Sequence, residues 1–381
     1  MTLTLEEPRD FDLTGPLPTG TTVLEASAGT GKTYAIAALA TRHLAEGLVR
    51  IDELMMVTFS RAATSELRNR TYLRLRQAIS ALDTFLEQGT SAADPVDALL
   101  CQGSPQAVRE RRDRLAEALA EIDQATIATT HEFCQRMLSE LGLLADHDHT
   151  VRFSEDIGDL AEQVVHDVYL AEQVERTGPA PGRLATFTRF AHVGRAALRE
   201  VDLPVEPAEA QGLSAERVAF AHRVRERLEQ RKRLAGVYTF DDMVNRLRDA
   251  LAHPVTGRLA ADRLARRFPL VMIDEFQDTD PVQWQIVRQA FVGRCTVILI
   301  GDPKQSIYAF RGADVNAYLE AVACADRVFG LGTNHRSDAG VVGGIGELFA
   351  GVAMGDPRIV AHPVRARHQA ARLRGPRQAQ Y

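Results

Sequence analysis

A lysine and a threonine that end a glycine-rich turn are the first residues whose types and spacing could do chemistry. Residues 25–34 read EASAGTGKTY, which ends like the phosphate-binding pattern G-x-x-x-x-G-K-[ST] but has Ala26 at its first position. In such a loop, backbone N–H groups face the phosphates, the lysine ammonium binds them and the hydroxyl binds Mg²⁺. The sequence predicts an ATP site formed by Ala26, Ser27, Ala28, Gly29, Thr30, Gly31, Lys32 and Thr33.

The alanine at the first loop position leads to a conformational prediction. An alanine at positive φ costs about 1 kcal/mol or more relative to glycine. We therefore expect Ala26 at negative φ, with Gly29 and Gly31 making the close approaches to phosphate.

Two acids and a glutamine follow other apolar runs. In VMIDEFQD we expect Asp274 to hold Mg²⁺, directly or through water, and Glu275 to orient and deprotonate the attacking water. Such acids could instead cap a helix, but the phosphate loop upstream favours the catalytic interpretation. Gln305, in GDPKQ, follows a buried strand by a few residues, and we expect it near the γ-phosphate, where a neutral amide can report whether that phosphate is present. A single glutamine on a loop is normally only solvated, so this role depends on the surrounding string GDPKQSIYAFRGA.

Buried strands must position these residues. Apolar runs at 21–26, 53–60, 269–275 and 295–302, and a β-branched start to 125–138, predict strands, with helices from 32, over 61–82 and through 109–123. Solid apolar runs are typical of parallel strands covered by helices on both faces. The fold class is therefore α/β, a P-loop NTPase with a parallel sheet flanked by helices.

Charged helical segments interrupted by TGPAPG and VDLPVEPAEAQG predict a helical insert. The chain then divides into four parts: 1–139, the first part of an ATPase lobe; 140–235, the insert; 236–333, the rest of the lobe; and 334–381, the start of a second lobe with an arginine-rich tail.

Bulk composition excludes several classes of protein. A chain of 381 residues with 45% hydrophobic and 25% charged residues is long enough for two or three domains, and its net charge of −6 means that any nucleic-acid site must be local. Its four cysteines are scattered, which argues against zinc, an iron–sulfur cluster or a disulfide framework. Since no apolar stretch approaches the roughly 18 residues of a membrane span and the N-terminus lacks signal-peptide order, we expect a cytoplasmic protein without a membrane partner.

A series of ordered strings carries a family resemblance. EASAGTGKT, VTFSRAATSELRNR, TIATTHEFC, VMIDEFQDTDPVQ, LIGDPKQSIYAFRGAD and LGTNHRS resemble the motifs of UvrD/Rep-type superfamily 1 DNA helicases. EASAGTGKT and TFDDM (239–243) are most similar to the RecB family, the helicase–nuclease subunits of RecBCD complexes. The resemblance spans roughly residues 11 to 360.

The resemblance implies roles for single residues around the nucleotide. Two RecA-like lobes would clamp ATP–Mg²⁺ and move 3′ to 5′ along single-stranded DNA. Gln305 matches the γ-phosphate sensor, and Arg336 in TNHRS matches an arginine that reaches γ-phosphate, although a single arginine is by default a surface residue. His335 stands where the family has an adenine-stacking tyrosine. Phe11, in FDLTGPLPTG, stands where an adenine-reading glutamine motif is expected.

The resemblance also implies a DNA track. Its residues would be aromatics that stack on bases, joined by polar contacts to backbone or base edges: Thr58, Phe59, Arg61, Thr130, His131, Tyr308, Phe310 and Arg311. Stacking contributes about 1–3 kcal/mol per base whatever the sequence. A lone phenylalanine beside a strand is otherwise a core residue.

The family's later second-lobe motifs and the RecB nuclease domain are not found before Tyr381. We therefore expect an incomplete motor that binds ATP–Mg²⁺ weakly, hydrolyses it slowly and does not unwind duplexes alone. Implied partners are single-stranded DNA, DNA ends, and RecC-like and RecD-like subunits. The alternative is a non-catalytic lobe that binds DNA or docks to subunits; IYAFRGA and TNHRS nearly exclude another P-loop enzyme such as a kinase.

Overall fold

The computed structural model describes residues 8–145, 152–154, 156–175, 183–199, 205, 207, 209, 211–309 and 312–372. It separates into two compact units, Met1–His147 with Val244–Tyr381, and Asp148–Met243. Two expected DNA-contacting residues, Phe310 and Arg311, and the tail from 373 onward lie outside the described residues.

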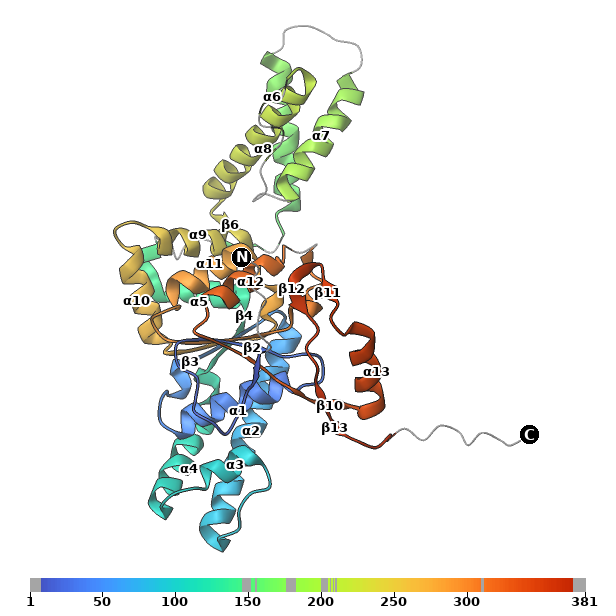
Figure 1. Ribbon diagram of the computed structural model, residues 1–381. Helices are drawn as coiled ribbons and strands as arrows, with labels where there is room; N and C mark the ends of the chain where they lie inside the picture. Colours follow the sequence, from blue (N-terminus) through green and yellow to red (C-terminus); the bar gives the residue numbers. More distant parts are fainter. Residues whose placement is uncertain are drawn as a thin grey trace, which may run out of the picture. The chain divides into compact units, whose positions relative to one another are not determined.

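A seven-stranded parallel sheet organises the larger unit, in the order β1-β9-β2-β8-β7-β3-β4 (Figure 1). The strands are Arg9–Asp10 (β1), Thr21–Glu25 (β2), Leu54–Thr58 (β3), Thr126–Thr129 (β4), Leu270–Ile273 (β7), Thr296–Gly301 (β8) and Arg327–Gly330 (β9). The α/β parallel-sheet prediction is confirmed. Sequence reasoning missed β1 and β9, which have only two and four residues.

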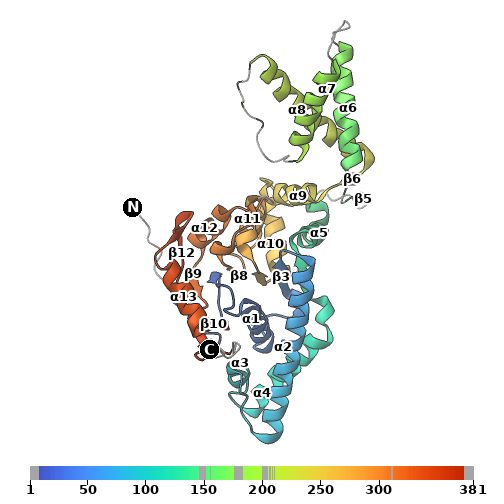
Figure 2. The ribbon, with the colours of Figure 1, turned by 90° about the vertical axis from the view of Figure 1, so that its right-hand side faces the viewer.

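Helices cover both faces of this sheet, as the apolar strands require (Figure 2). Leu24 and Met56 pack in the core beneath helices α1, α2 and α4, whereas Val57 and Ile273 face α5 and α11. The covering helices are Lys32–Ala45 (α1), Arg61–Gln88 (α2), Pro95–Leu100 (α3), Pro105–Ala120 (α4), Thr130–Leu141 (α5), Gly257–Arg267 (α10), Pro281–Ala290 (α11) and Val315–Cys324 (α12).

Helix α2 shows how local sequence sets an element's bounds. Ser60 caps its start by accepting a hydrogen bond from Ala63 N at 3.1 Å, and Gly89 ends it at φ 69°. The helix therefore extends six residues beyond the expected 61–82, because the break in the sequence comes only at Gly89.

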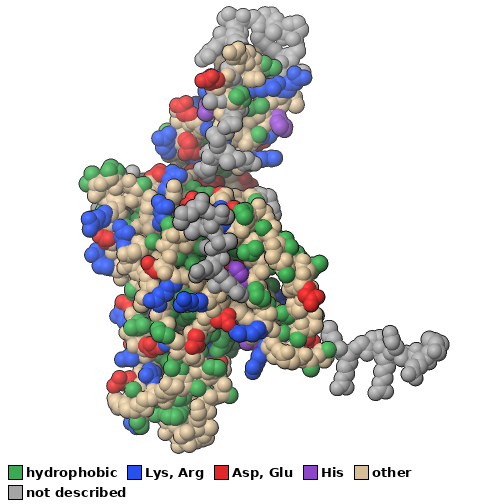
Figure 3. Space-filling view, in the orientation of Figure 1, with side chains coloured by type: hydrophobic (Ala, Val, Ile, Leu, Met, Phe, Trp, Pro, Cys, Tyr) green, Lys and Arg blue, Asp and Glu red, His purple; other side chains and the backbone are tan. Residues whose placement is uncertain are grey.

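The segment that follows the seven-stranded sheet forms short strands and one helix that do not join that sheet. These are Thr333–Asp338 (β10), Ala339–Phe349 (α13), Ala353–Met354 (β11), Asp356–Val360 (β12) and Arg365–His368 (β13), with β10 and β13 parallel. Helix α13 has no buried residue: Val341, Ile345 and Leu348 are 53%, 55% and 72% exposed. Basic and acidic side chains are interspersed over the described part of the face in Figure 3, so overall charge does not mark a binding site there.

The smaller unit is a helical bundle with its own core. Helices α6 (Gly158–Glu175), α7 (Arg183–Arg199) and α8 (Leu213–Ala235) pack Val164, Phe190 and Phe220 against one another. Two short parallel strands, β5 (Arg152–Phe153) and β6 (Val237–Tyr238), flank it, and α9 (Phe240–Ala252) follows. The division of the chain into the four parts 1–139, 140–235, 236–333 and 334–381 stays a prediction.

The four cysteines form no disulfide among themselves. Cys101 and Cys134 are buried, Cys295 is half-buried and Cys324 is exposed, and all four are free thiols. Within the described ranges, no helix combines the length and the hydropathy of a membrane span. The short 3₁₀ turns are Ile51–Glu53 (η1), Ile122–Gln124 (η2), Gly142–Ala145 (η3), Phe276–Asp278 (η4) and Pro303–Gln305 (η5).

Candidate functional site

The glycine-rich loop connects β2 to α1 in the middle of the sheet. The Ala26 N–H donates to the Gly301 carbonyl at 3.0 Å, and Ala26 itself is fully buried. Gly29 and Gly31 have φ of 82° and 89°, whereas Glu275 is the one non-glycine residue with positive φ in the described part of the chain. The predicted negative φ of Ala26 is therefore confirmed.

The loop also has the features of an anion cradle. Thr30 donates both N–H and Oγ1 to the Ser27 carbonyl, at 3.2 and 2.8 Å, which closes the turn. Gly31 is the N-cap of the 14-residue helix α1, and this helix start has neither a side-chain cap nor an acid in its first turn. Since the first N–H groups of a helix attract anions, the start of α1 suits phosphate. The approach of Gly29 and Gly31 to phosphate stays a prediction.

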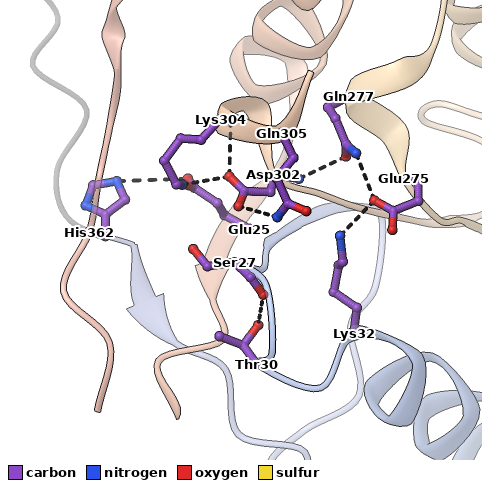
Figure 4. Close-up of polar contacts among 10 residues, drawn as sticks. All are labelled: Glu25, Ser27, Thr30, Lys32, Glu275, Gln277, Asp302, Lys304, Gln305 and His362. Carbon is purple, nitrogen blue, oxygen red and sulfur yellow. Dashed lines mark hydrogen bonds and ion pairs between the residues drawn. The ribbon is translucent and has the colours of Figure 1, made fainter. Parts of the chain in front are cut away.

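The expected acid pair lies opposite this loop. A hydrogen bond of 2.8 Å from Asp274 N to the Val57 carbonyl fixes the end of β7 beside β3. Glu275 then turns into the left-handed region, at φ 51° and ψ 42°, and its Oε2 lies 2.7 Å from Lys32 Nζ. The structure thus brings Lys32 and Glu275 into a direct ion pair (Figure 4).

Burial and like charge raise the pKa values of two carboxyl groups at this site. Burial, joined by the charge of Glu275, raises the pKa of Asp274 from 3.8 to about 6, with Lys32 opposing the rise. The same two causes raise the pKa of Asp278 to about 6. Carboxyls with raised pKa values, here Asp274 and Asp278 near the Lys32–Glu275 ion pair, are often found at functional sites.

Oxygen ligands for Mg²⁺ are available at this position. Thr33 is the second residue of α1, and Asp274 directly follows β7. Mg²⁺ is usually held by one or two carboxylates together with phosphate oxygens and water. The described residues contain no group of three or more His, Cys, Asp or Glu side chains that could hold a metal alone. The residues present therefore fit Mg²⁺ bound together with a nucleotide.

Gln305 is linked to the acid pair by hydrogen bonds (Figure 4). Its Nε2 donates to Asp302 Oδ2 at 2.6 Å, and Asp302 N donates to Gln277 Oε1 at 3.0 Å. Gln277 Nε2 in turn donates to Glu275 Oε2 at 2.8 Å. The sensor candidate on η5 is thus connected to the candidate base through two residues that sequence reasoning did not assign.

A second buried ammonium lies beside this connection. Lys304 Nζ is 2.7 Å from Glu25 Oε1 and 2.8 Å from Asp302 Oδ1. Although burial opposes the charge, the two carboxylates hold the pKa of Lys304 above its ordinary value. His362 Nε2 lies 3.9 Å from Glu25. This ion cluster also escaped the sequence reading, because a lysine or glutamate at a strand end shows no partner in the sequence.

The TNHRS segment contacts the loop through its backbone and through Asn334. Asn334 Nδ2 donates to the Ala28 carbonyl at 3.0 Å, and His335 N donates to the Gly29 carbonyl at 2.8 Å. A Cβ on Gly29 would lie 2.8 Å from Arg336 Cβ. The structure therefore places His335 and Arg336 beside the loop, both exposed, with buried Asn334 as the anchor that the sequence reading missed.

The candidate DNA residues lie along the ends of β3 and β4. Thr58 is buried at the end of β3, and Thr130 begins α5 directly after β4. Phe59 and Tyr308 stack on each other with ring centroids 5.0 Å apart and planes 25° apart. Arg61 and His131 are exposed at the first turns of α2 and α5.

Phe11, which stands where the family has its adenine-reading motif, contacts a residue of β9. Its ring packs edge-on against Phe329, with centroids 5.4 Å apart, at the sheet edge.

A family comparison covers most of the residues of this site. The model of the UvrD/REP helicase N-terminal domain matches residues 13–324. The chain belongs to the UvrD/REP helicase family. The match covers the loop, the acid pair and Gln305, whereas His335 and Arg336 lie beyond it. The recognition made from the motifs is thereby confirmed.

Curated relatives point to one branch of this helicase family. The chain is 46% identical to RecBCD enzyme subunit RecB of Mycolicibacterium smegmatis over 373 residues, 96% of this chain and 33% of the relative. It is 41% identical to RecB of Mycobacterium tuberculosis, over 95% and 33% of the two chains. RecB of Escherichia coli is 28% identical over 87% and 38%. The chain thus spans about a third of the length of these relatives.

Proposed function

We propose that this site binds ATP with Mg²⁺ and hydrolyses it, and that hydrolysis drives 3′-to-5′ movement along single-stranded DNA. The observation that carries the proposal is the ion pair between Lys32 and Glu275 at 2.7 Å. This contact supports the proposal because Lys32, the candidate phosphate ligand, and Glu275, the candidate base, lie together beside a loop with two left-handed glycines.

Each side chain has a distinct task in the proposed reaction. Lys32 binds the β- and γ-phosphates. Thr33 and Asp274 would hold Mg²⁺, which would supply positive charge against the phosphates. Glu275 accepts a proton from the attacking water. Gln305 senses γ-phosphate.

Residues from TNHRS complete the nucleotide site in this proposal. Arg336 stabilises charge on the phosphates, and the His335 imidazole stacks on the adenine. Both lie beside the loop glycines.

The DNA track runs from the nucleotide toward β3 and β4 in this proposal. Phe59 and Tyr308 offer the stacking surface, and Tyr308 follows η5, the turn that carries Gln305. A change in the η5 turn with the nucleotide would thus reach the stacked pair within three residues. Thr58, Thr130, His131, Arg61, Phe310 and Arg311 are proposed as the polar and stacking contacts around it.

The biological setting is proposed from the relatives. A RecB-like protein would act in the cytoplasm on DNA ends, in recombination and double-strand break repair, with RecC-like and RecD-like partner subunits. For the 381-residue chain alone we expect weak ATP binding, slow hydrolysis and no duplex unwinding. Robust unwinding by the purified chain would contradict this expectation.

DNA-stimulated ATPase activity tests the catalytic assignment. The wild type should release phosphate faster with oligo-dT than without it. Lys32→Ala and Glu275→Gln should remove the stimulated rate, since they remove the phosphate ligand and the base. Glu87→Gln, the same chemical change at an exposed position of α2, should keep it. Equal background in wild type and Glu275→Gln would favour a non-catalytic lobe that binds DNA or docks to subunits.

A further inference from the structure

Gln277 is a buried amide between the two halves of the candidate site. It is 2% exposed and lies in η4, directly after the acid pair. Its Nε2 donates to Glu275 Oε2 at 2.8 Å, and its Oε1 accepts from Asp302 N at 3.0 Å. Its backbone carbonyl accepts from Ser306 Oγ at 3.2 Å. One residue therefore contacts both the base and the η5 turn (Figure 4).

The two side-chain bonds leave this amide one orientation. Asp302 N can only donate, so Oε1 must face it, and Nε2 must then face the carboxylate of Glu275. A flipped amide would put donor against donor at Asp302 and acceptor against acceptor at Glu275. Because the group is buried, each lost partner would leave an unsatisfied polar atom.

The space for this amide depends on a glycine in the neighbouring strand. A Cβ on Gly301, the last residue of β8, would lie 2.7 Å from Gln277 Oε1 and 3.1 Å from its backbone N. Any side chain at 301 would displace the amide. The strand end and the amide therefore fit together.

The bonds also define how the Glu275 carboxylate is held. Lys32 Nζ and Gln277 Nε2 both engage Oε2, whereas Oε1 takes part in neither bond. The ammonium comes from α1 and the amide from η4, so the carboxylate is held from two sides. Oε1 is then the oxygen that can accept a proton.

We propose that Gln277 is a positioning residue that fixes the Glu275 carboxylate and couples it, through Asp302, to Gln305. This inference rests on the proposed ATP hydrolysis. A shift of the η5 turn on sensing γ-phosphate would move Asp302 N, and the amide would transmit that shift to the base. The connection comprises three hydrogen bonds, at 2.6, 3.0 and 2.8 Å.

A pH profile separates positioning from a merely structural role. In Gln277→Glu a second carboxylate replaces the amide next to Glu275, where Lys32, Asp274 and Asp278 are the other charged neighbours. Two carboxylates in contact raise the pKa of the pair. We expect the acid limb of kcat to move up by about one pH unit or more. Gln285→Glu, the same change at an exposed position of α11, should leave the acid limb in place.

Gln277→Leu removes the bonds without adding a charge. We expect kcat to fall by about 10- to 100-fold, as for impaired general-base catalysis, with KM for ATP within about twofold of wild type. Fluorescence of the single tryptophan, Trp284, verifies that the unit is folded. The ring centroids of Trp284 and Phe276 are 5.6 Å apart. An unshifted acid limb in Gln277→Glu, or a kcat equal to wild type in Gln277→Leu, would overturn the proposal.

Hydrogen exchange gives a readout that needs no activity. In Gln277→Leu the Asp302 N–H loses its acceptor, so its exchange should speed up by about tenfold or more, while amides of β7 stay protected. Unchanged exchange at Asp302 would overturn the link even in an active protein. A wild type without DNA-stimulated ATPase would instead overturn the proposed function, and the exchange result would still decide whether the link exists.

Discussion

Replacing Asp274, the proposed metal ligand, by asparagine should stabilise the larger unit. The carboxyl has a pKa of about 6 because burial, and then the charge of Glu275, disfavour its ionised form. Asparagine has nearly the same shape, and its Oδ1 can still accept the 2.9 Å hydrogen bond from Glu275 N. The substitution therefore removes the unfavourable charge and keeps the local geometry.

The size and sign of the effect follow from proton linkage. The folded pKa of about 6 lies above the ordinary value of 3.8, so the folded state binds the proton more tightly. About two pH units at about 1.4 kcal/mol each give at most about 3 kcal/mol, and relaxation around the site reduces this toward 1 kcal/mol. Below pH 3.8 both states are protonated and the advantage of Asp274→Asn should vanish. It should grow between pH 3.8 and 6 and stay constant above.

Urea unfolding followed by Trp284 fluorescence measures this difference. Trp284 is the single tryptophan and is 2% exposed in α11, so its emission reports the unit that contains the site. The buffer contains EDTA and no nucleotide, because ligand binding would stabilise the wild type selectively. A variant no more stable than wild type at pH 7.5, or an advantage that is the same at pH 4 and pH 7.5, would refute the reasoning.

Three further predictions concern the loop and the aromatic pair. Ala26→Gly should lower the free energy of unfolding by about 1 kcal/mol without tightening ATP binding, because the position needs no positive φ. A urea titration measures the free energy of unfolding, and a fluorescence titration with nucleotide measures the binding. Gly29→Ala should cost more than Gly89→Ala in the same titration, since both have positive φ but only Gly29 has Arg336 within 2.8 Å of the new Cβ. Phe59→Ala should weaken binding of oligo-dT by about 1–3 kcal/mol in fluorescence anisotropy, and an unchanged affinity would refute a stacking role.

Sequence patterns predicted the central strands because each is an apolar run buried on both faces. Val23, Met272 and Leu299 are all fully or nearly fully buried, and this continuous burial is what the pattern records. Strand β1, at the sheet edge, and strand β9, between β1 and β2, escaped prediction for the converse reason. They have only two and four residues, and Arg9 and Arg327 at their starts are exposed. Pairing of such short strands depends on tertiary contacts that the local sequence does not encode.

The motifs also predicted which residues come together around Lys32, but not how they are held. Lys32 and Glu275 could be paired because strand ends of a parallel sheet share one edge. Lys304 and Asn334 could not, since their partners, Glu25 and the Ala28 carbonyl, lie hundreds of residues away in the sequence. Such partners depend on side-chain orientation at the strand ends, which a pattern of residue types does not contain.

Three features near the end of β7 each lower the stability of the fold, and together they favour one of the two candidate functions. Asp274 is a buried carboxyl with a raised pKa, Glu275 adopts a left-handed backbone that costs about 1–2 kcal/mol, and Gln277 is a buried amide that must be fully satisfied. A lobe that only docks or binds DNA would need none of them. Their partners, Lys32 and Asp302 N, belong to the loop and the η5 turn, which are the parts that would contact ATP. These unfavourable features thus lie together at the residues proposed to hydrolyse ATP. Their position favours the catalytic proposal over the docking one.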